Sequence, residues 1–136
     1  MAETLNVNIL VYNLDDTASG WQGDGVFGHI LKAPSAAHGG AITVVAAYAA
    51  NQAATGAGTG FGLSLLNYGT AGTAVGGTVA VEIGGTADPW AAGVPKEFTI
   101  SDGVLDAGEW LVLEKEETNS SDPTRCSVII HYLVGK

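Results

Sequence analysis

Residues 76–85 read GGTVAVEIGG, a short alternating run with a pair of glycines at each end. Val79, Val81 and Ile83 occupy every second position, and side chains at every second position of a strand share one face. Glycine pairs favour turns because glycine adopts backbone conformations that are closed to other residues. The stretch therefore predicts a β-strand between two turns, with these three side chains facing a core.

The same pattern recurs along the chain, which contains 20 glycines in 136 residues. Breaks rich in glycine follow one another at about a dozen residues, the spacing typical of β-sandwiches and barrels. Residues 5–12, LNVNILVY, form the clearest other run. Taken together, the alternating positions predict a core made of the following residues: Val7, Ile9, Val11, Leu63, Leu65, Val79, Val81, Ile83, Trp110, Val112, Val128 and Ile130.

Two segments carry additional information. In segment 41–54, residues 42–45 form the β-branched run ITVV, which favours a strand, but Ala46–Ala54 has a high helix propensity. We expect a long strand there, with a short helix as the alternative. Residues 126–134, CSVIIHYLV, are apolar on both faces. This last strand is therefore expected to lie centrally in a sheet or against another subunit.

About eight such strands are expected, and no composition shift divides the chain. The sequence is 46% hydrophobic and 14% charged, which is typical of a folded protein. We expect a single β-sandwich domain over residues 1–136, with residues 1–4 as a flexible N-terminal arm.

The charge balance excludes some partners. Fourteen acidic residues against five basic ones give a net charge of −9, so the chain is not expected to bind nucleic acid. No apolar run is long enough to span a membrane. Residues 1–4, MAET, lack the basic region and apolar segment of a secretory signal, so export by such a signal is not expected. The single cysteine, Cys126, cannot form an internal disulfide. Synthesis in a reducing cytoplasm is the expectation.

Residues that carry out chemistry are scarce. The glycine-rich segment 56–62 has Phe61 where a phosphate-binding loop needs lysine followed by serine or threonine. The three histidines lack partners at metal-ligand spacing, and Cys126 lies within an apolar run. We therefore predict a protein that is not an enzyme, with no catalytic residues, metal or cofactor.

Tryptophans offer the remaining candidates. Trp110 falls on a predicted strand, whereas Trp21 and Trp90 fall in predicted loops. A loop tryptophan can stack on a sugar, fill an interface with a partner, or pack over the edge of the core. All three interpretations of Trp21 and Trp90 remain open.

From Gly40 to Lys136 the chain resembles small structural proteins of tailed bacteriophages. The resemblance lies in YAANQAATGAGTGF (48–61), LNYGTAGTAVGGT (66–78), DAGEWLVL (106–113) and IHYLVG (130–135). Proteins of this kind include the capsid decoration, or cement, proteins, some of which are jelly-roll trimers on the outer shell of the head. Their motifs consist of strands and turns, so no binding residue is carried over from them.

The resemblance implies an all-β, jelly-roll-like antiparallel sandwich of about eight strands. It further implies a virion protein on the outer capsid surface, with the major capsid protein and its own copies, as a homotrimer, as partners. Trp21 and Trp90 are the candidate capsid contacts, and His131 and Leu133 are the candidate oligomer contacts. A phage tail, fibre or head-completion component is one alternative, and a carbohydrate-binding sandwich that uses Trp21 and Trp90 is another.

Overall fold

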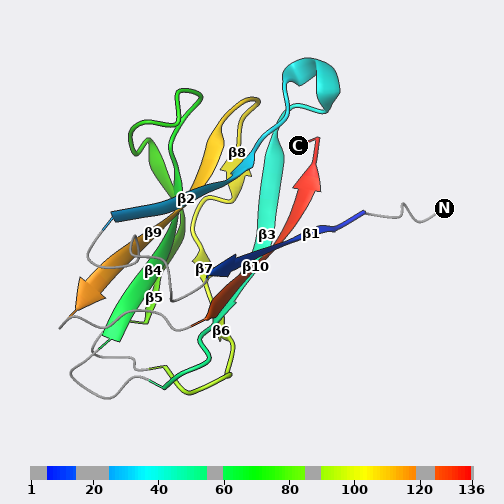
Figure 1. Cartoon of the computed structure of the whole chain (residues 1–136). Coiled ribbons are helices and arrows are strands. Elements are labelled where there is room, and N and C mark those ends of the chain that lie inside the picture. The colour runs from blue at the N-terminus through cyan, green and yellow to red at the C-terminus, as the bar shows by residue number, and fades with distance from the viewer. Residues whose placement is uncertain (1–5, 15–24, 55–59, 85–89, 119–124, 136) are drawn as a thin grey trace.

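Two antiparallel sheets face each other in the computed structural model of the chain, which describes residues 6–14, 25–54, 60–84, 90–118 and 125–135. One sheet has the order β1-β10-β3-β6, with β8 also paired to β3, and the other has the order β2-β9-β4-β5-β7 (Figure 1). The strands are β1 (Asn8–Leu14), β2 (Gly25–Lys32), β3 (Ile42–Ala50), β4 (Gly60–Asn67), β5 (Gly77–Gly84), β6 (Lys96–Glu97), β7 (Thr99–Ile100), β8 (Val104–Leu105), β9 (Trp110–Thr118) and β10 (Cys126–Val134).

The chain winds between the two sheets. β1 and β2 belong to different sheets, as do β3 and β4, and β9 and β10; the first and last strands are neighbours. This is the wrapping of a jelly roll, so the predicted all-β, jelly-roll-like sandwich is confirmed. The described residues form ten strands where about eight are expected, because the short segment 96–100 is divided into β6 and β7 and because β8 is added.

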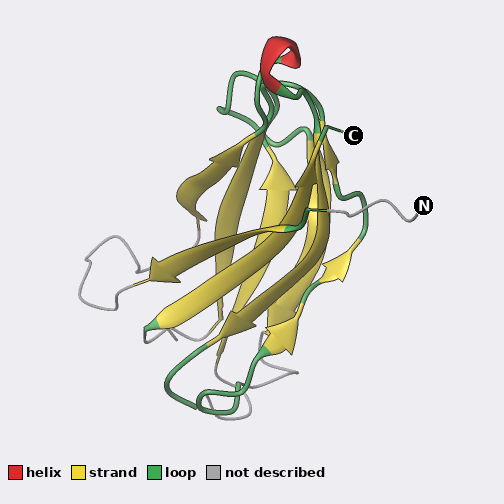
Figure 2. Ribbon diagram, turned by 90° about the vertical axis from the view of Figure 1, so that its right-hand side faces the viewer, coloured by secondary structure: helices red, strands yellow, loops and turns green. Residues whose placement is uncertain are grey.

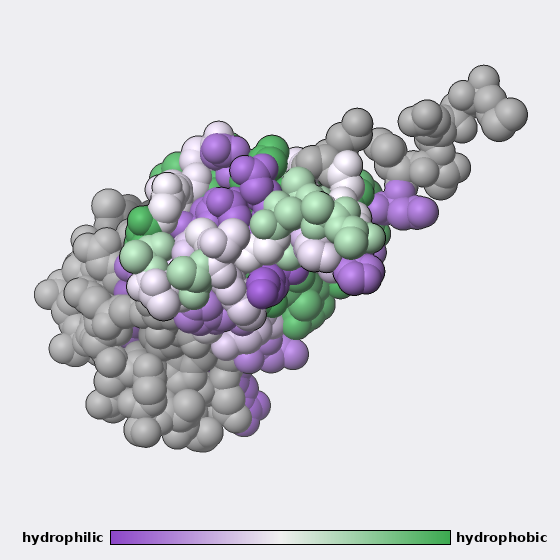
Figure 3. Space-filling model, turned by 90° about the horizontal axis from the view of Figure 1, so that it is seen from above, coloured by the Kyte–Doolittle hydropathy of each residue, from purple (hydrophilic) through white to green (hydrophobic). Residues whose placement is uncertain are grey.

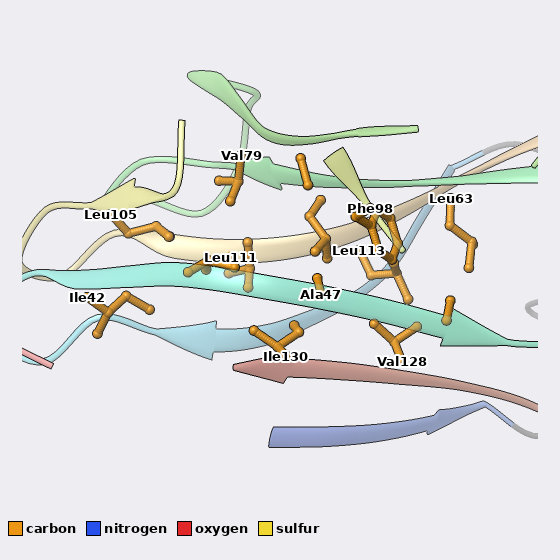
Figure 4. Packing of buried hydrophobic residues seen from close by; sticks show 14 of the residues in the cluster. Ile42, Ala47, Leu63, Val79, Phe98, Leu105, Leu111, Leu113, Val128 and Ile130 are labelled. Carbon is orange, nitrogen blue, oxygen red and sulfur yellow. The ribbon is translucent and has the colours of Figure 1, made fainter. Parts of the chain in front are cut away.

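Phe98 marks the point at which the chain crosses from one sheet to the other. β6, just before it, pairs with β3, and β7, just after it, pairs with β5. The Phe98 amide donates a hydrogen bond of 2.9 Å to the carbonyl oxygen of Ala47. Its side chain is buried between the sheets (Figure 4). A large apolar side chain thus fills the core where the backbone has left one sheet for the other.

Side chains from both sheets form the core (Figure 4). Five predicted core residues are confirmed in the core cluster: Leu63, Leu65, Val79, Val128 and Ile130. Val112 is also buried, but it lies outside this cluster, to which its neighbours Leu111 and Leu113 belong. Ile83 belongs to β5, but its side chain lies outside the described part of the structure.

The predicted orientation of the first strand is wrong. Val7, Ile9 and Val11 are 49%, 63% and 52% exposed, whereas Leu10 and Tyr12 pack against the core. Tyr12 lies over Gly28, where any larger residue would collide with its ring. Because residues 9–12 are all apolar, alternation alone does not distinguish the two faces of this strand.

Two other predicted core residues also face outward. Val81 is 47% exposed while Val79 and Ala80 are buried, because the pairing of β4 with β5 is irregular between Leu63 and Leu66. An irregular register breaks the simple alternation. Trp110 is only half-buried and lies outside the core cluster.

The alanine-rich segment is a strand, as expected. β3 covers Ile42–Ala50, and the strand ends before Asn51. Ala47 and Ala49 are fully buried. A single 3-10 turn, η2 (Ala36–His38), is the one helical element in the described ranges and was not expected. β10 lies between β1 and β3, which confirms its predicted central position.

Candidate interaction surfaces

The outward side of β1, β10 and β3 is an apolar surface, which we call the outer face. Its paired residues are Ile9 with His131, Val11 with Ile129, and Ile129 with Tyr48. Ile9 is the most exposed of the large apolar residues described. Figure 2 turns this side of the molecule toward the viewer. In this sheet the three neighbouring strands therefore present apolar side chains to both the core and the surroundings.

No charged side chain interrupts these strands. β1 reads NILVYNL, β3 reads ITVVAAYAA and β10 reads CSVIIHYLV. None of these residues is Asp, Glu, Lys or Arg, although the chain as a whole carries a net charge of −9. The acidic residues are therefore confined to other parts of the chain.

The centre and one end of the outer face carry polar groups of distinct kinds. In the centre, the rings of Tyr48 and His131 meet edge to face with centroids 5.6 Å apart. At one end, the Ser127 hydroxyl donates a hydrogen bond of 2.8 Å to the Asn13 side-chain oxygen. The outer face thus combines an aromatic pair in an apolar centre with an uncharged polar end.

His131 and Leu133, the candidate oligomer contacts, both belong to this surface. The register between β10 and β3 shifts after His131 and leaves Val45, which is 45% exposed, out of the pairing. Beyond the shift, Tyr132 packs against the core, so alternation directs Leu133 outward. Both side chains are half-buried, and their role in an interface stays a prediction.

A second cluster lies on the outward side of the other sheet. His29 donates a hydrogen bond of 2.6 Å from its Nε2 to the carbonyl oxygen of Gly72. Its ring meets those of Trp110 and Tyr68 edge to face, with centroids 5.4 and 6.0 Å apart. His29 and His131 therefore lie on opposite faces of the sandwich and do not form a common site.

Trp110 is covered from several directions. Lys32 Nζ lies 5.2 Å from the centre of its ring, and a Cβ on Gly72 would lie 2.8 Å from its Cδ1 atom. These contacts leave only part of the indole ring open to a ligand. Trp110 therefore closes a small packing cluster rather than forming a bare stacking platform.

Trp90 does not have the role predicted for a contact residue. It is 1% exposed and belongs to the core cluster, and Lys96 Nζ lies 5.3 Å from the centre of its ring. A buried ring is not available to stack on a sugar or to touch a capsid. Of the three interpretations, packing over the core is therefore correct for Trp90, whereas Trp21 lies outside the described residues.

The single thiol is unsuited to nucleophilic chemistry. Burial raises the pKa of Cys126 from its ordinary value of 9.0 to about 12, so the thiol stays protonated near neutral pH, and only the thiolate is a good nucleophile. Within the described ranges, no group of three or more His, Cys, Asp or Glu side chains is placed to hold a metal ion. No described helix is long and apolar enough to cross a membrane.

The upper end of the molecule has a different character from the outer face. Seen from above, it mixes hydrophilic and hydrophobic residues (Figure 3).

The chain matches no protein-family model, no curated protein and no solved structure. The resemblance to phage structural proteins therefore stays a prediction.

Proposed function

We propose that this protein is a virion structural protein of a tailed bacteriophage. It is a capsid decoration, or cement, protein that binds the outer surface of the head, where its partners are the major capsid protein and its own copies in a homotrimer. It is made in the host cytoplasm. The observation that supports the proposal most is a jelly-roll-like sandwich that carries a broad charge-free apolar surface.

Such a protein stabilises a shell by mass action. A ligand that binds the assembled lattice but not its separated subunits shifts the equilibrium toward the lattice. A trimer on a three-fold position makes three contacts at once, so weak individual contacts give strong overall binding. Neither effect needs a catalytic group.

The charge of the chain fits an outer position better than an inner one. A net charge of −9 repels packaged DNA, because binding to DNA depends on cations that neutralise phosphates. On the outside of the head the acidic regions face solvent, and they oppose association between decorated particles.

A sugar-binding function loses part of its basis. That alternative relied on Trp21 and Trp90 as stacking platforms, and Trp90 is buried. A tail, fibre or head-completion role uses the same kind of fold and is separated from the capsid role by experiment.

Removal of the gene tests the proposal. We expect heads that lack the protein to assemble normally but to rupture at a lower temperature, or sooner after a chelator is added, than decorated heads. Supplying purified protein to such heads should restore their resistance. Heads of equal robustness with and without the protein would contradict the proposal, as would a location on the tail.

A further inference from the structure

The ends of the two sheets differ in how they are protected. An exposed sheet edge pairs readily with another strand, and proteins usually prevent this with short strands, charges, prolines or bulges. β6, β7 and β8 are each two residues long. β2 contains Lys32, and its pairing with β9 is interrupted twice. These edges therefore carry the usual protection.

β1 carries none of these devices. It has seven residues, all in unbroken register with β10, and contains neither charge nor proline. It lies at the end of its sheet, with no second strand beside it in the described part of the chain. It is therefore the one long, regular and uncharged edge among the described strands.

The outer face continues from this edge. β1, β10 and β3 are seven to nine residues long, so their face covers roughly 400 Å² in projection, given usual strand spacings. The face includes the polar pair Asn13 and Ser127, and its area lies within the range of the largest patches on monomeric proteins, which are often functional. Depletion of charge and enrichment in aromatic residues distinguish the centre of an interface, and Tyr48 and His131 occupy the centre of this face.

Charge indicates what covers this surface. A basic partner recognising an acidic protein needs acidic side chains in the contact, and the outer face has none. Within the three strands an identical copy meets no like charge; Glu97 of β6, which pairs with Tyr48, lies at the opposite edge of the sheet from β1. A second copy also supplies an equally unprotected strand edge.

We propose that copies of this chain associate through the β1 edge and the outer face, with Ile9 and Val11 at the centre of the contact. The contact buries the two exposed apolar side chains of β1 and satisfies backbone groups along its free edge. Pairing of the same edge from two identical chains is isologous and forms about a two-fold axis, so the contact joins the chains in pairs. It does not depend on the phage function, since the argument uses only the edge, the face and the charge distribution.

Sedimentation velocity of matched variants tests the proposal. The variant Ile9→Lys/Val11→Lys places two charges on the proposed contact. The control Val75→Lys/Val81→Lys places the same charge on side chains that are 55% and 47% exposed and lie outside the outer face. Far-ultraviolet circular dichroism checks that each variant is folded.

At about 100 µM, we expect the unaltered protein and the control to sediment as a multiple of the 13.7 kDa chain. The Ile9→Lys/Val11→Lys variant should sediment as a single chain. A monomeric unaltered protein would overturn the proposal and leave the surface to a different partner. An oligomeric Ile9→Lys/Val11→Lys variant, or dissociation by the control alone, would also overturn it.

Hydrogen exchange of the unaltered protein provides a test that needs no variant. On dilution, the amides of β1 should lose protection as copies separate, while those of β9, a central strand, should not change. Protection of β1 that is independent of concentration would contradict the proposal. Both measurements are separable from capsid binding, because a chain can self-associate without binding heads and can bind heads as a monomer.

Discussion

The Tyr68 hydroxyl donates a hydrogen bond of 2.8 Å to Glu114 Oε2, and so ties the segment after β4 to the middle of β9. Glu114 shares the outward side of β9 with Val112, which is nevertheless fully buried. Tyr68 itself is 8% exposed and its ring lies beside that of His29. The second sheet thus has a small packed layer on its outward side, in contrast to the open outer face of the first sheet.

Loss of this hydrogen bond should weaken the fold without changing it. We expect Tyr68→Phe to lower the free energy of unfolding by about 1 kcal/mol, because the ring still packs while one hydrogen bond to a carboxylate is lost. Urea unfolding followed by circular dichroism measures the change. A stability equal to that of the unaltered protein would show that water replaces the bond at no cost.

Alkaline pH should destabilise the protein. Burial, and secondarily Glu114, raises the pKa of Tyr68 from 10.0 to about 12, and burial raises that of Cys126 from 9.0 to about 12. The unfolded chain therefore releases these protons first, and stability falls as pH rises from about 9 toward 12. Below pH 9 neither group contributes a pH dependence.

Variants separate these two contributions. Cys126→Ala should make the free energy of unfolding fall less steeply with pH from pH 9 upward. Tyr68→Phe should have the same effect from pH 10 upward. The slope of unfolding free energy against pH, measured by urea titration, reports each effect. An unchanged slope in Cys126→Ala would mean that the thiol ionises equally in both states.

Two glycines form a matched pair for a test of close packing. Gly69 and Gly72 have nearly the same backbone angle, φ of +66° and +68°. A Cβ at Gly69 meets nothing within 4 Å, whereas one at Gly72 would lie 2.8 Å from Trp110 Cδ1. Alanine at Gly69 should cost about 1 kcal/mol from backbone strain alone.

Alanine at Gly72 should cost more, because the Trp110 ring must also move. Its tryptophan fluorescence should change, whereas that of Gly69→Ala should not. An equal loss of unfolding free energy at Gly69 and Gly72 would show that the Trp110 ring moves aside at no energetic cost.

The core and the surface of one sheet should respond differently to truncation. Leu65 is fully buried and Val81 is 47% exposed. We expect Leu65→Ala to cost about 2–5 kcal/mol through lost burial and a cavity, and Val81→Ala to stay within about 0.5 kcal/mol. Thermal and urea unfolding measure both, and a large cost at Val81 would mean that this face is covered in solution.

Strand positions followed from the sequence wherever alternation was clear. In β4, Leu63 and Leu65 alternate with Gly62 and Ser64, and both were predicted correctly as core. In β10, Val128 and Ile130 were also predicted correctly, although both faces of that strand are apolar. In β1 both faces are apolar, and tertiary packing selected Leu10 and Tyr12 for the core. The exposure of Ile9, which carries the proposed contact, was therefore missed.

Long-range contacts explain the other errors. Trp90 follows a loop signal in the sequence, and its burial depends on packing between distant elements. Phe98 interrupts what reads as one short strand, because its two halves pair with different sheets. No local sequence pattern predicts the burial of Trp90 or the crossing of the chain between sheets at Phe98. The signal available for the outer face was the absence of charge from three separated strands, which became informative once the topology made them neighbours.

Electron microscopy of purified protein mixed with undecorated heads tests the proposed function most directly. The expected result is additional density at regularly repeated positions on the outer surface of the shell, of a size that fits copies of this chain. Heads incubated without the protein should lack that density. Absence of density on the shell, or density confined to tails, would contradict the capsid function.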